Sequence, residues 1–270
     1  MMRASITERV LNYVILVLFA AQALIPILYV LLLALQSERI GDDSFWHLEN
    51  FATAWKQGHF SQYMTNSVII AVLVVSLALV LSLMSGYVLG ILRPRGGDIL
   101  FYIFLLGIMV PSEAIVLPLF FDLRDAGLTD TIWAVALPQT AQSLAFGTFW
   151  MRAYFRGVDP AILEAARIDG AGDVRILTSI LLPLGRPAIV TQIVLTFMWT
   201  WNDFLIPLVM SPSGKMRTAP LGLAFFQGQY TQGSTLLAAG AVLVALPMVV
   251  LYLLLQKQFI SGMTEGAVKG

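Results

Sequence analysis

Six long stretches of the 270-residue chain are apolar and contain no Lys or Arg. An α-helix needs about 20 apolar residues to cross the hydrocarbon core of a bilayer. Because a backbone in lipid must satisfy its own hydrogen bonds, runs of this length predict helices and not the shorter alternating strands of a membrane barrel. The six predicted spans are residues 10–35, 68–92, 99–121, 132–151, 189–210 and 237–255. The pattern therefore predicts an all-α membrane protein with six transmembrane helices, organised as a single domain over residues 1–270.

Composition removes several classes of function. Hydrophobic residues make up 58% of the chain and charged residues only 12%, about half the charged fraction of a soluble domain. With 16 basic and 16 acidic residues the net charge is zero, so no basic field is present to bind nucleic acid. The chain has no Cys and only two His, without the spacing of a metal site. We expect no metal, no cofactor and no catalytic residue.

The distribution of Lys and Arg predicts the orientation in the membrane. Five of the 16 basic residues fall in the loops 36–67, 122–131 and 211–236, and the other eleven fall in the termini and the opposite loops. Positive residues accumulate on the cytoplasmic side, so both termini are predicted to be cytoplasmic. The first apolar run is too long for the core of a cleaved signal peptide, and we expect it to be retained as a span.

The segment 152–188 is the longest predicted cytoplasmic loop and is much longer than an ordinary connection between helices. Asp159 followed by Pro160 is typical of a helix start, since Asp accepts from first-turn N–H groups and Pro fits the first helical position. Gly170 is expected to end this helix, and Asp173 to cap a second one. The second predicted helix runs from Val174 to Leu182.

The same loop carries a spaced motif, EAA-x3-G-x9-I-x-LP. It consists of Glu164-Ala165-Ala166, Gly170, Ile180 and Leu182-Pro183. It resembles the cytoplasmic signature of the permease subunits of bacterial binding-protein-dependent ABC importers, in particular the carbohydrate importers with a six-span permease of the maltose-transporter type. The resemblance extends over most of the chain through Glu49-Asn50-Phe51, Asn66-Ser67, Trp201-Asn202-Asp203-Phe204 and Pro220-Leu221-Gly222-Leu223.

This resemblance implies a type I ABC importer permease fold in a bacterial cytoplasmic (inner) membrane. Its loop would be a coupling helix that docks on a separate ATPase through Glu164, Ala165, Ala166, Asp169 and Gly170. The implied partners are a second homologous permease, two ATP-binding subunits and an extracytoplasmic substrate-binding protein. The chain itself has no phosphate-binding GxxxxGK[ST] loop, so ATP hydrolysis is expected in another subunit. Alternatively, Glu164 only pairs with a neighbouring Arg on a solvated helix face.

Two ionisable residues, Glu113 and Asp203, lie within the predicted spans. At about 1.5 Å per residue both lie about 21 Å from the cytoplasmic edge, and Gln139 falls at about the same height. Such groups are costly in lipid, which marks them as candidates for a substrate pathway. A second set lies along one stripe of the fifth span, with Asn202 beside it: Gln192, Thr196, Trp199 and Asp203. Hydroxyls of a sugar need such donors and acceptors, and a sugar ring stacks on aromatics such as Trp199. Alternatively, these polar groups only bridge helices.

The predicted outer loop 211–235 is rich in Gly, Gln and aromatic residues. By the resemblance, Gln227, Gln229 and Tyr230 would contact the docked substrate-binding protein. Alternatively, the loop is solvated and carries an interfacial aromatic belt.

The sequence therefore predicts an ABC importer permease for a sugar or related polyol. One rival is an ion-coupled secondary transporter that uses Glu113 and Asp203 as proton carriers, although no paired repeats with broken helices are evident. A second rival is an intramembrane enzyme, for which two carboxylates on separate spans give little support.

Overall fold

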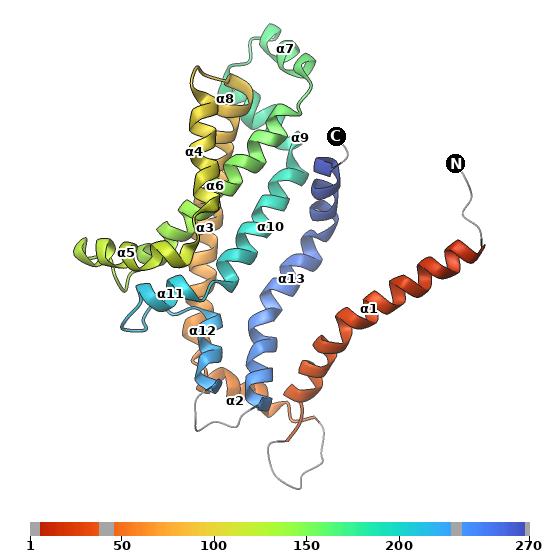
Figure 1. Cartoon of the computed structure of the whole chain (residues 1–270), viewed down its shortest axis with the longest axis vertical. Coiled ribbons are helices and arrows are strands. Elements are labelled where there is room, and N and C mark those ends of the chain that lie inside the picture. The colour runs from red at the N-terminus through yellow and green to blue at the C-terminus, as the bar shows by residue number, and fades with distance from the viewer. Residues whose placement is uncertain (1–5, 38–45, 228–233, 268–270) are drawn as a thin grey trace. The chain divides into compact units, whose positions relative to one another are not determined.

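The computed structural model describes residues 6–37, 46–227 and 234–267. The chain divides into two compact units. Unit 1 contains Met1–Ser61 and Gly222–Leu246, and unit 2 contains Gln62–Leu221 and Pro247–Gly270. All elements of the described ranges are helices, and Figure 1 labels most of them. The expected all-α class is confirmed.

The longer helices are α1 (Ile6–Ala34), α3 (Phe60–Tyr87), α4 (Gly97–Met109), α5 (Ser112–Asp125), α6 (Ile132–Arg156), α10 (Arg186–Asn202) and α13 (Ser234–Ala267). The shorter ones are α2 (Glu49–Gln57), α7 (Pro160–Ile168), α8 (Asp173–Arg175), α9 (Leu182–Leu184), α11 (Leu205–Met210) and α12 (Ala219–Leu223). Two π-helical segments, η1 (Val88–Leu92) and η2 (Ile176–Leu181), and a 3-10 turn, η3 (Ala224–Gln227), complete the described ranges.

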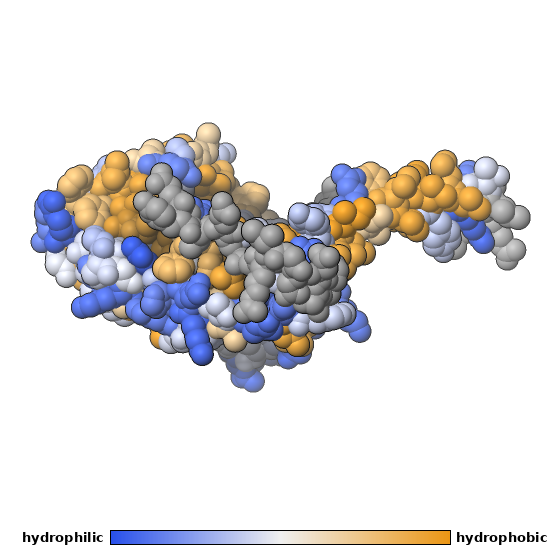
Figure 2. Space-filling view, turned by 90° about the horizontal axis from the view of Figure 1, so that it is seen from below, coloured by the Kyte–Doolittle hydropathy of each residue, from blue (hydrophilic) through white to orange (hydrophobic). Residues whose placement is uncertain are grey.

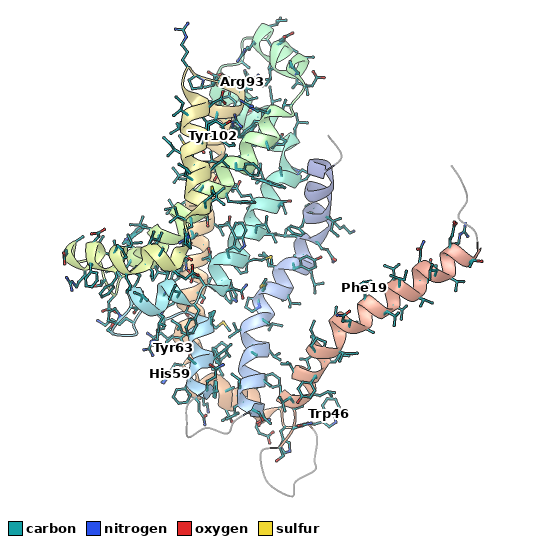
Figure 3. The ribbon with its side chains drawn as sticks, in the orientation of Figure 1. Phe19, Trp46, His59, Tyr63, Arg93 and Tyr102 are labelled. Atoms are coloured by element: carbon teal, nitrogen blue, oxygen red, sulfur yellow. The ribbon has the colours of Figure 1, made fainter. Side chains whose placement is uncertain are left out.

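In unit 1, α1 presents apolar side chains on all sides. The side chain of Phe19, for example, projects from the helix (Figure 3) and is 67% exposed, and most of the described side chains of this helix are coloured as hydrophobic in Figure 2. The amide of Asn50 closes the C-terminal end of this helix by donating to the carbonyls of Ala34 and Gln36, at 3.0 and 2.8 Å. A helix that is hydrophobic all round requires lipid or another protein around it.

A second feature of unit 1 is an aromatic core around Phe60, which is fully buried. Its ring stacks on Phe226 with a centroid distance of 6.5 Å and tilts against Trp55 at 6.3 Å. These contacts anchor the 3-10 turn η3 to the start of α3.

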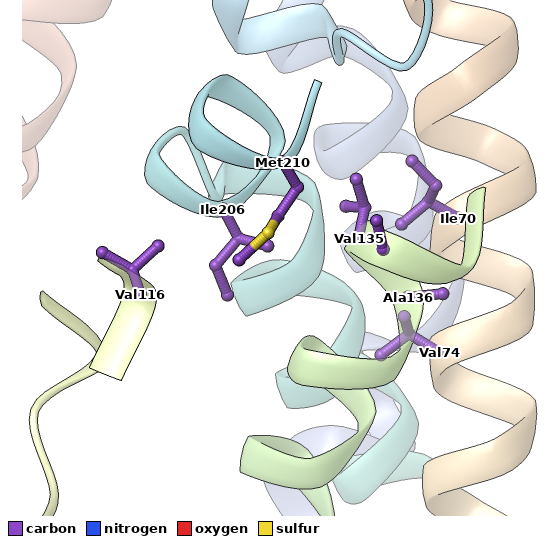
Figure 4. Close-up of a cluster of buried hydrophobic side chains, with 8 residues drawn as sticks. Ile70, Val74, Val116, Val135, Ala136, Ile206 and Met210 are labelled. Atoms are coloured by element: carbon purple, nitrogen blue, oxygen red, sulfur yellow. The ribbon is translucent and has the colours of Figure 1, made fainter. Parts of the chain in front are cut away.

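Unit 2 has one apolar cluster where α3, α5, α6 and α11 meet (Figure 4). Its buried members include Ile70 and Val74 of α3, Val135 of α6, and Ile206 and Met210 of α11. The cluster holds the short helix α11 against α6.

A second apolar cluster of unit 2 joins the segment 152–188 to the ends of α3 and α6. Tyr87, Phe155, Ala166 and Ile176 are buried together, and the rings of Tyr87 and Phe155 meet edge to face at 5.8 Å. The loop between Arg93 and α4 lies at the same end of unit 2 as α7 (Figures 1 and 3). The α7 segment is therefore fixed to the ends of α3 and α6.

The count of six spans is not confirmed. Three helical stretches of the described residues are long and apolar enough to cross a membrane by themselves, namely Thr7–Ala34, Phe60–Leu92 and Ser234–Ile260, and two bent pairs raise the number to at most five. The third predicted span, 99–121, is interrupted, because α4 and α5 meet at an angle of 97°. Val110 is extended, as a residue before a proline tends to be.

The segment 152–188 follows the prediction at both helices and departs from it at the expected cap of the second. The Asp159 carboxylate accepts from the N–H of Ala161 at 2.9 Å, so the expected N-cap of α7 is confirmed. The expectation for Asp173 was wrong: it is the first residue of α8, and its side chain accepts from the Tyr87 hydroxyl at 2.9 Å instead of capping. The predicted second helix is present, since the chain is helical from Asp173 to Leu184, with the π-helical η2 in its middle.

Candidate solute cavity and coupling surface

A cavity of about 320 Å³ lies in unit 2 between α5, α6 and the end of α10. Its lining includes Ser112, Gln139, Ser143, Trp199, Asn202 and Asp203. Four of the five predicted pathway residues thus come together from two helices. Glu113 does not join them in the lining; it is exposed in the first turn of α5, beyond the bend that follows α4.

Asp203 lies at the break between α10 and α11. One carboxylate oxygen accepts from the N–H groups of Leu205 and Ile206, at 3.0 and 3.3 Å, and so caps α11. The other oxygen accepts from the Gln139 amide at 2.7 Å. One carboxylate oxygen therefore caps α11, and the other holds the α10–α11 break against α6.

Trp199 and Asn202 give the cavity an aromatic face and an amide. Trp199 is 47% exposed, and its ring rests edge-on against Phe146 with a centroid distance of 4.8 Å. The Asn202 amide donates to the Met198 carbonyl at 2.8 Å and lies 3.4 Å from the sulfur of Met248. An aromatic ring supported from behind is suited to stack on the apolar face of a ligand ring.

Two buried oxygens of residues that line the cavity have no hydrogen-bond partner within the described residues. They are the Oε1 atom of Gln139 and the hydroxyl of Thr200. Buried polar atoms are normally paired, and leaving one unpaired costs about 1–3 kcal/mol. The lining therefore has unused hydrogen-bonding capacity.

The predicted coupling residues separate into an exposed set and a buried one. Glu164, Ala165, Asp169 and Gly170 are exposed, whereas Ala166 is only 6% exposed and packs inside its own chain. Across the part of the chain that the structure describes, Glu164 forms no ion pair with Arg167 or any other residue. Its carboxylate is thus free on the surface.

Sequence reasoning missed the most exposed apolar groups of this surface. Ile168, at the end of α7, is 86% exposed and Val174, in α8, is 77% exposed. Gly170 lies between them with φ +77°, a left-handed conformation that favours glycine. Neither residue is among the five coupling residues that the sequence predicts.

In unit 1, the outer segment predicted to contact a binding protein is anchored by one of its two phenylalanines. Phe226 is buried against Phe60, while Phe225 is half exposed and packs edge-on near His59 at 6.3 Å. Gln227 is exposed. The other two residues of this prediction, Gln229 and Tyr230, lie outside the described residues.

The connection after α11 is tied to neighbouring elements of unit 2. Asp130 accepts from the hydroxyl and the N–H of Ser213, and from the hydroxyl of Ser211 at 3.0 Å. These bonds, the Ser213 hydroxyl first among them, hold the pKa of the Asp130 carboxyl below its ordinary value of 3.8. Asn66 donates to the carbonyls of Lys215 and Arg217 at 2.8 and 2.9 Å, which fastens the same connection to α3.

Comparison with known proteins assigns the family. Residues 78–264 match the family described as "Binding-protein-dependent transport system inner membrane component". The chain belongs to this family. Members of the family are transport permease subunits of the inner membrane, and the ATPase of such a system is a separate subunit.

Similar proteins match over almost their whole length. The chain is 34% identical to the arabinooligosaccharides transport system permease protein AraQ of Halalkalibacterium halodurans, covering 98% of this chain and 99% of the relative. It is 34% identical to the maltodextrin permease protein MdxG of Bacillus subtilis, with 98% and 99% covered. It is 31% identical to the trehalose/maltose permease protein MalG of Thermococcus litoralis, and both chains are covered completely.

A solved structure has the same fold. A chain of a bacterial ABC transporter involved in the import of the acidic polysaccharide alginate superimposes with a TM-score of 0.74 at 24% identity, covering 96% of this chain and all of that one. The ABC importer permease fold expected from the sequence is therefore confirmed.

Proposed function

We propose that this chain is the membrane-spanning subunit of an ATP-driven ABC importer. It forms half of the translocation pathway for a sugar or related polyol, and it couples closure of the ATPase subunits to alternating access. The observation that carries the proposal is the cavity that gathers Gln139, Trp199, Asn202 and Asp203. Relatives named for arabinooligosaccharides, maltodextrin and trehalose/maltose support the class of solute.

The chemistry of the cavity fits a polyhydroxylated ligand. The Trp199 ring offers an apolar face, and the unpaired oxygens of Gln139 and Thr200 accept from hydroxyls. The Asp203 carboxylate already receives three hydrogen bonds from the chain. In this proposal Asp203 positions Gln139 and α11 and does not carry a proton.

The coupling role rests on the elbow formed by α7 and α8. Its buried side, which includes Ala166 and Ile176, is held by the same cluster as Tyr87 of α3 and Phe155 of α6. Its free side presents Glu164 and the exposed Ile168. A stiff elbow with an apolar tip and an unpaired carboxylate can bind a partner surface and transmit its rigid-body displacement.

The proposed assembly contains this chain, a second homologous permease, two ATP-binding subunits and an extracytoplasmic substrate-binding protein. Both termini lie on the cytoplasmic side in the inner membrane, as the basic residues predict. Gln227, with Gln229 and Tyr230, faces the binding protein, and residues 1–270 act as one permease domain.

Uptake into proteoliposomes tests the function. The assembled complex with its binding protein should accumulate labelled sugar only when ATP is present on the side of the ATPase subunits, and a protonophore should not change the rate. Uptake by this chain alone, driven by a proton gradient, would instead favour the secondary transporter with Glu113 and Asp203 as carriers.

A pair of variants tests the coupling surface. Ile168→Asp places a charge on the apolar tip and should reduce uptake by more than tenfold while the protein still inserts. Ser179→Asp adds the same charge at an exposed position of η2 and serves as the matched control. Equal uptake by the two variants would remove α7 from the coupling interface.

A further inference from the structure

A line of buried polar side chains leaves the cavity and follows the contact between α3, α6 and α10. Thr200, at the cavity, is followed on α10 by Thr196 and Gln192, each four residues back and so on the same face. Ser82 of α3 completes the line. We refer to these four residues as the polar seam; all of them are buried, and Thr196 and Gln192 are each only 1% exposed.

The polar atoms of the seam are unpaired. The hydroxyls of Thr200, Thr196 and Ser82, together with both amide atoms of Gln192, find no hydrogen-bond partner among residues 6–37, 46–227 and 234–267. Neighbouring hydroxyls do pair: Thr191 donates to the Pro187 carbonyl at 2.9 Å. Since an unpaired buried polar group costs about 1–3 kcal/mol, a dry seam of this length is strongly unfavourable.

The seam faces one side of α6 that carries Gln139, Ser143 and Gly147 at intervals of four residues; we call these three residues the α6 stripe. At the cavity end, Gln139 of α6 is hydrogen-bonded to Asp203. Eight residues further along α6, a side chain at Gly147 would collide with both the Ser82 hydroxyl and the Gln192 amide nitrogen. These two groups therefore converge on one bare patch of α6 backbone, and Ser143 lies between the two ends of the stripe.

We propose that the polar seam binds hydroxyl groups and extends the cavity along the helix contact. The five unpaired atoms of the seam and Gln139 Oε1 make six, and the Gln192 amide nitrogen among them is a donor. Together they supply the two to four partners that each bound water needs. The hydroxyls come either from ordered water or from a polyol solute in transit. The solute source rests on the proposed function, whereas the water source does not.

Cysteine accessibility tests the proposal, because the chain contains no Cys of its own. Thr196→Cys and Val194→Cys change residues that are each 1% exposed on the same helix, one in the seam and one outside it. In the complete assembled transporter, 2-aminoethyl methanethiosulfonate should modify the first variant at least tenfold faster than the second, as measured by mass spectrometry. Equal rates would overturn the proposal.

The source of the hydroxyls is read from the same experiment in the presence of excess transported sugar. Protection of Thr196→Cys supports solute hydroxyls in the seam, and unchanged fast labelling supports water alone. Labelling does not require transport, so a failure of the proposed function leaves the contrast between the two variants measurable.

A second measurement separates a hydrated seam from a dry one. Thr196→Val exchanges the hydroxyl for a methyl group of the same shape, while Thr196→Ser keeps the hydroxyl. In a hydrated seam the valine variant has a lower Tm than the serine variant, because bound water loses a partner. A Tm above that of the unmodified protein for Thr196→Val would contradict hydration, since removal of an unpaired polar group stabilises a dry contact.

Discussion

Truncation of Asp203 should destabilise unit 2 through three hydrogen bonds at once. Asp203→Ala leaves the Gln139 amide and the N–H groups of Leu205 and Ile206 without their acceptor. Loss of a helix cap costs about 1 kcal/mol and loss of a hydrogen bond to a charged group about 1.5–3 kcal/mol. We expect the free energy of unfolding to fall by about 2.5–4 kcal/mol, which corresponds to a Tm lower by about 5–15 °C.

Asp203→Asn provides the matched control. The remaining carboxamide oxygen can still accept from the two backbone N–H groups, and Gln139 can turn its unpaired Oε1 toward the new NH2 group. This variant should therefore lose about 1 kcal/mol or less. Thermal unfolding of the purified complex in nanodiscs, followed by Trp fluorescence, compares the two.

Equal Tm values for the two variants would contradict this reasoning, because the negative charge rather than the hydrogen-bond geometry would then hold the α10–α11 break. The same variants also test how Asp203 acts in transport. ATP-driven uptake by Asp203→Asn should remain within about threefold of the unmodified rate, since a change of about 0.65 kcal/mol in the barrier is a factor of three. Complete loss would indicate a role for its ionisation.

Three further predictions concern a helix contact, an outer loop and the coupling elbow. Gly147→Ala places a methyl group 2.9 Å from Ser82 Cβ and over its hydroxyl. Overpacking destabilises the folded chain by about 1–3 kcal/mol, and the higher helix propensity of Ala offsets about 1 kcal/mol of this, so Tm should fall. Ser82→Ala in the same chain should recover part of the loss. Additive effects of the two changes would contradict the contact. The Asp130 carboxyl has a depressed pKa in the folded chain, so its stabilising effect is fully present above the unfolded value of 3.8 and is lost as pH falls through the folded value. Hydrogen exchange of residues 211–217 should accelerate over that interval, and Asp130→Asn should abolish the pH dependence. Gly170→Pro forces φ +77° toward about −65°, and we expect the protein to insert normally but to lose uptake while the ATPase remains active; unchanged uptake would argue against the coupling role.

The helices could be predicted from the apolar runs, but their breaks could not be read from the same runs. Apolar residues continue across Pro111, so the pattern predicts one span over residues 99–121. The sequence did contain a signal, because a residue before proline disfavours the helical conformation, and Val110 is extended. The start of α7 was predictable since Asp159 and Pro160 act through strictly local bonds, whereas the Asp173 contact with Tyr87 joins residues 86 positions apart.

The residue types at the cavity were predictable, and their orientation was not. The rise of a straight helix puts Asp203 and Gln139 at about the same height, and their side chains are hydrogen-bonded at 2.7 Å. The same calculation fails for Glu113, because it assumes a straight helix and the chain bends by 97° between α4 and α5. Ala166 shows the second limit: its inward direction depends on tertiary packing against Phe155, which one sequence does not specify.

The sharp turn after α4 also has a consequence for the surrounding lipid. A helix of 13 residues rises about 20 Å, about 10 Å less than a typical hydrocarbon core. The acyl chains beside α4 must then shorten or tilt, unless a neighbouring subunit fills the missing depth. Hydrophobic mismatch costs fractions of a kcal/mol per ångström, so the transport rate should vary with phospholipid chain length, with an optimum in bilayers thinner than average.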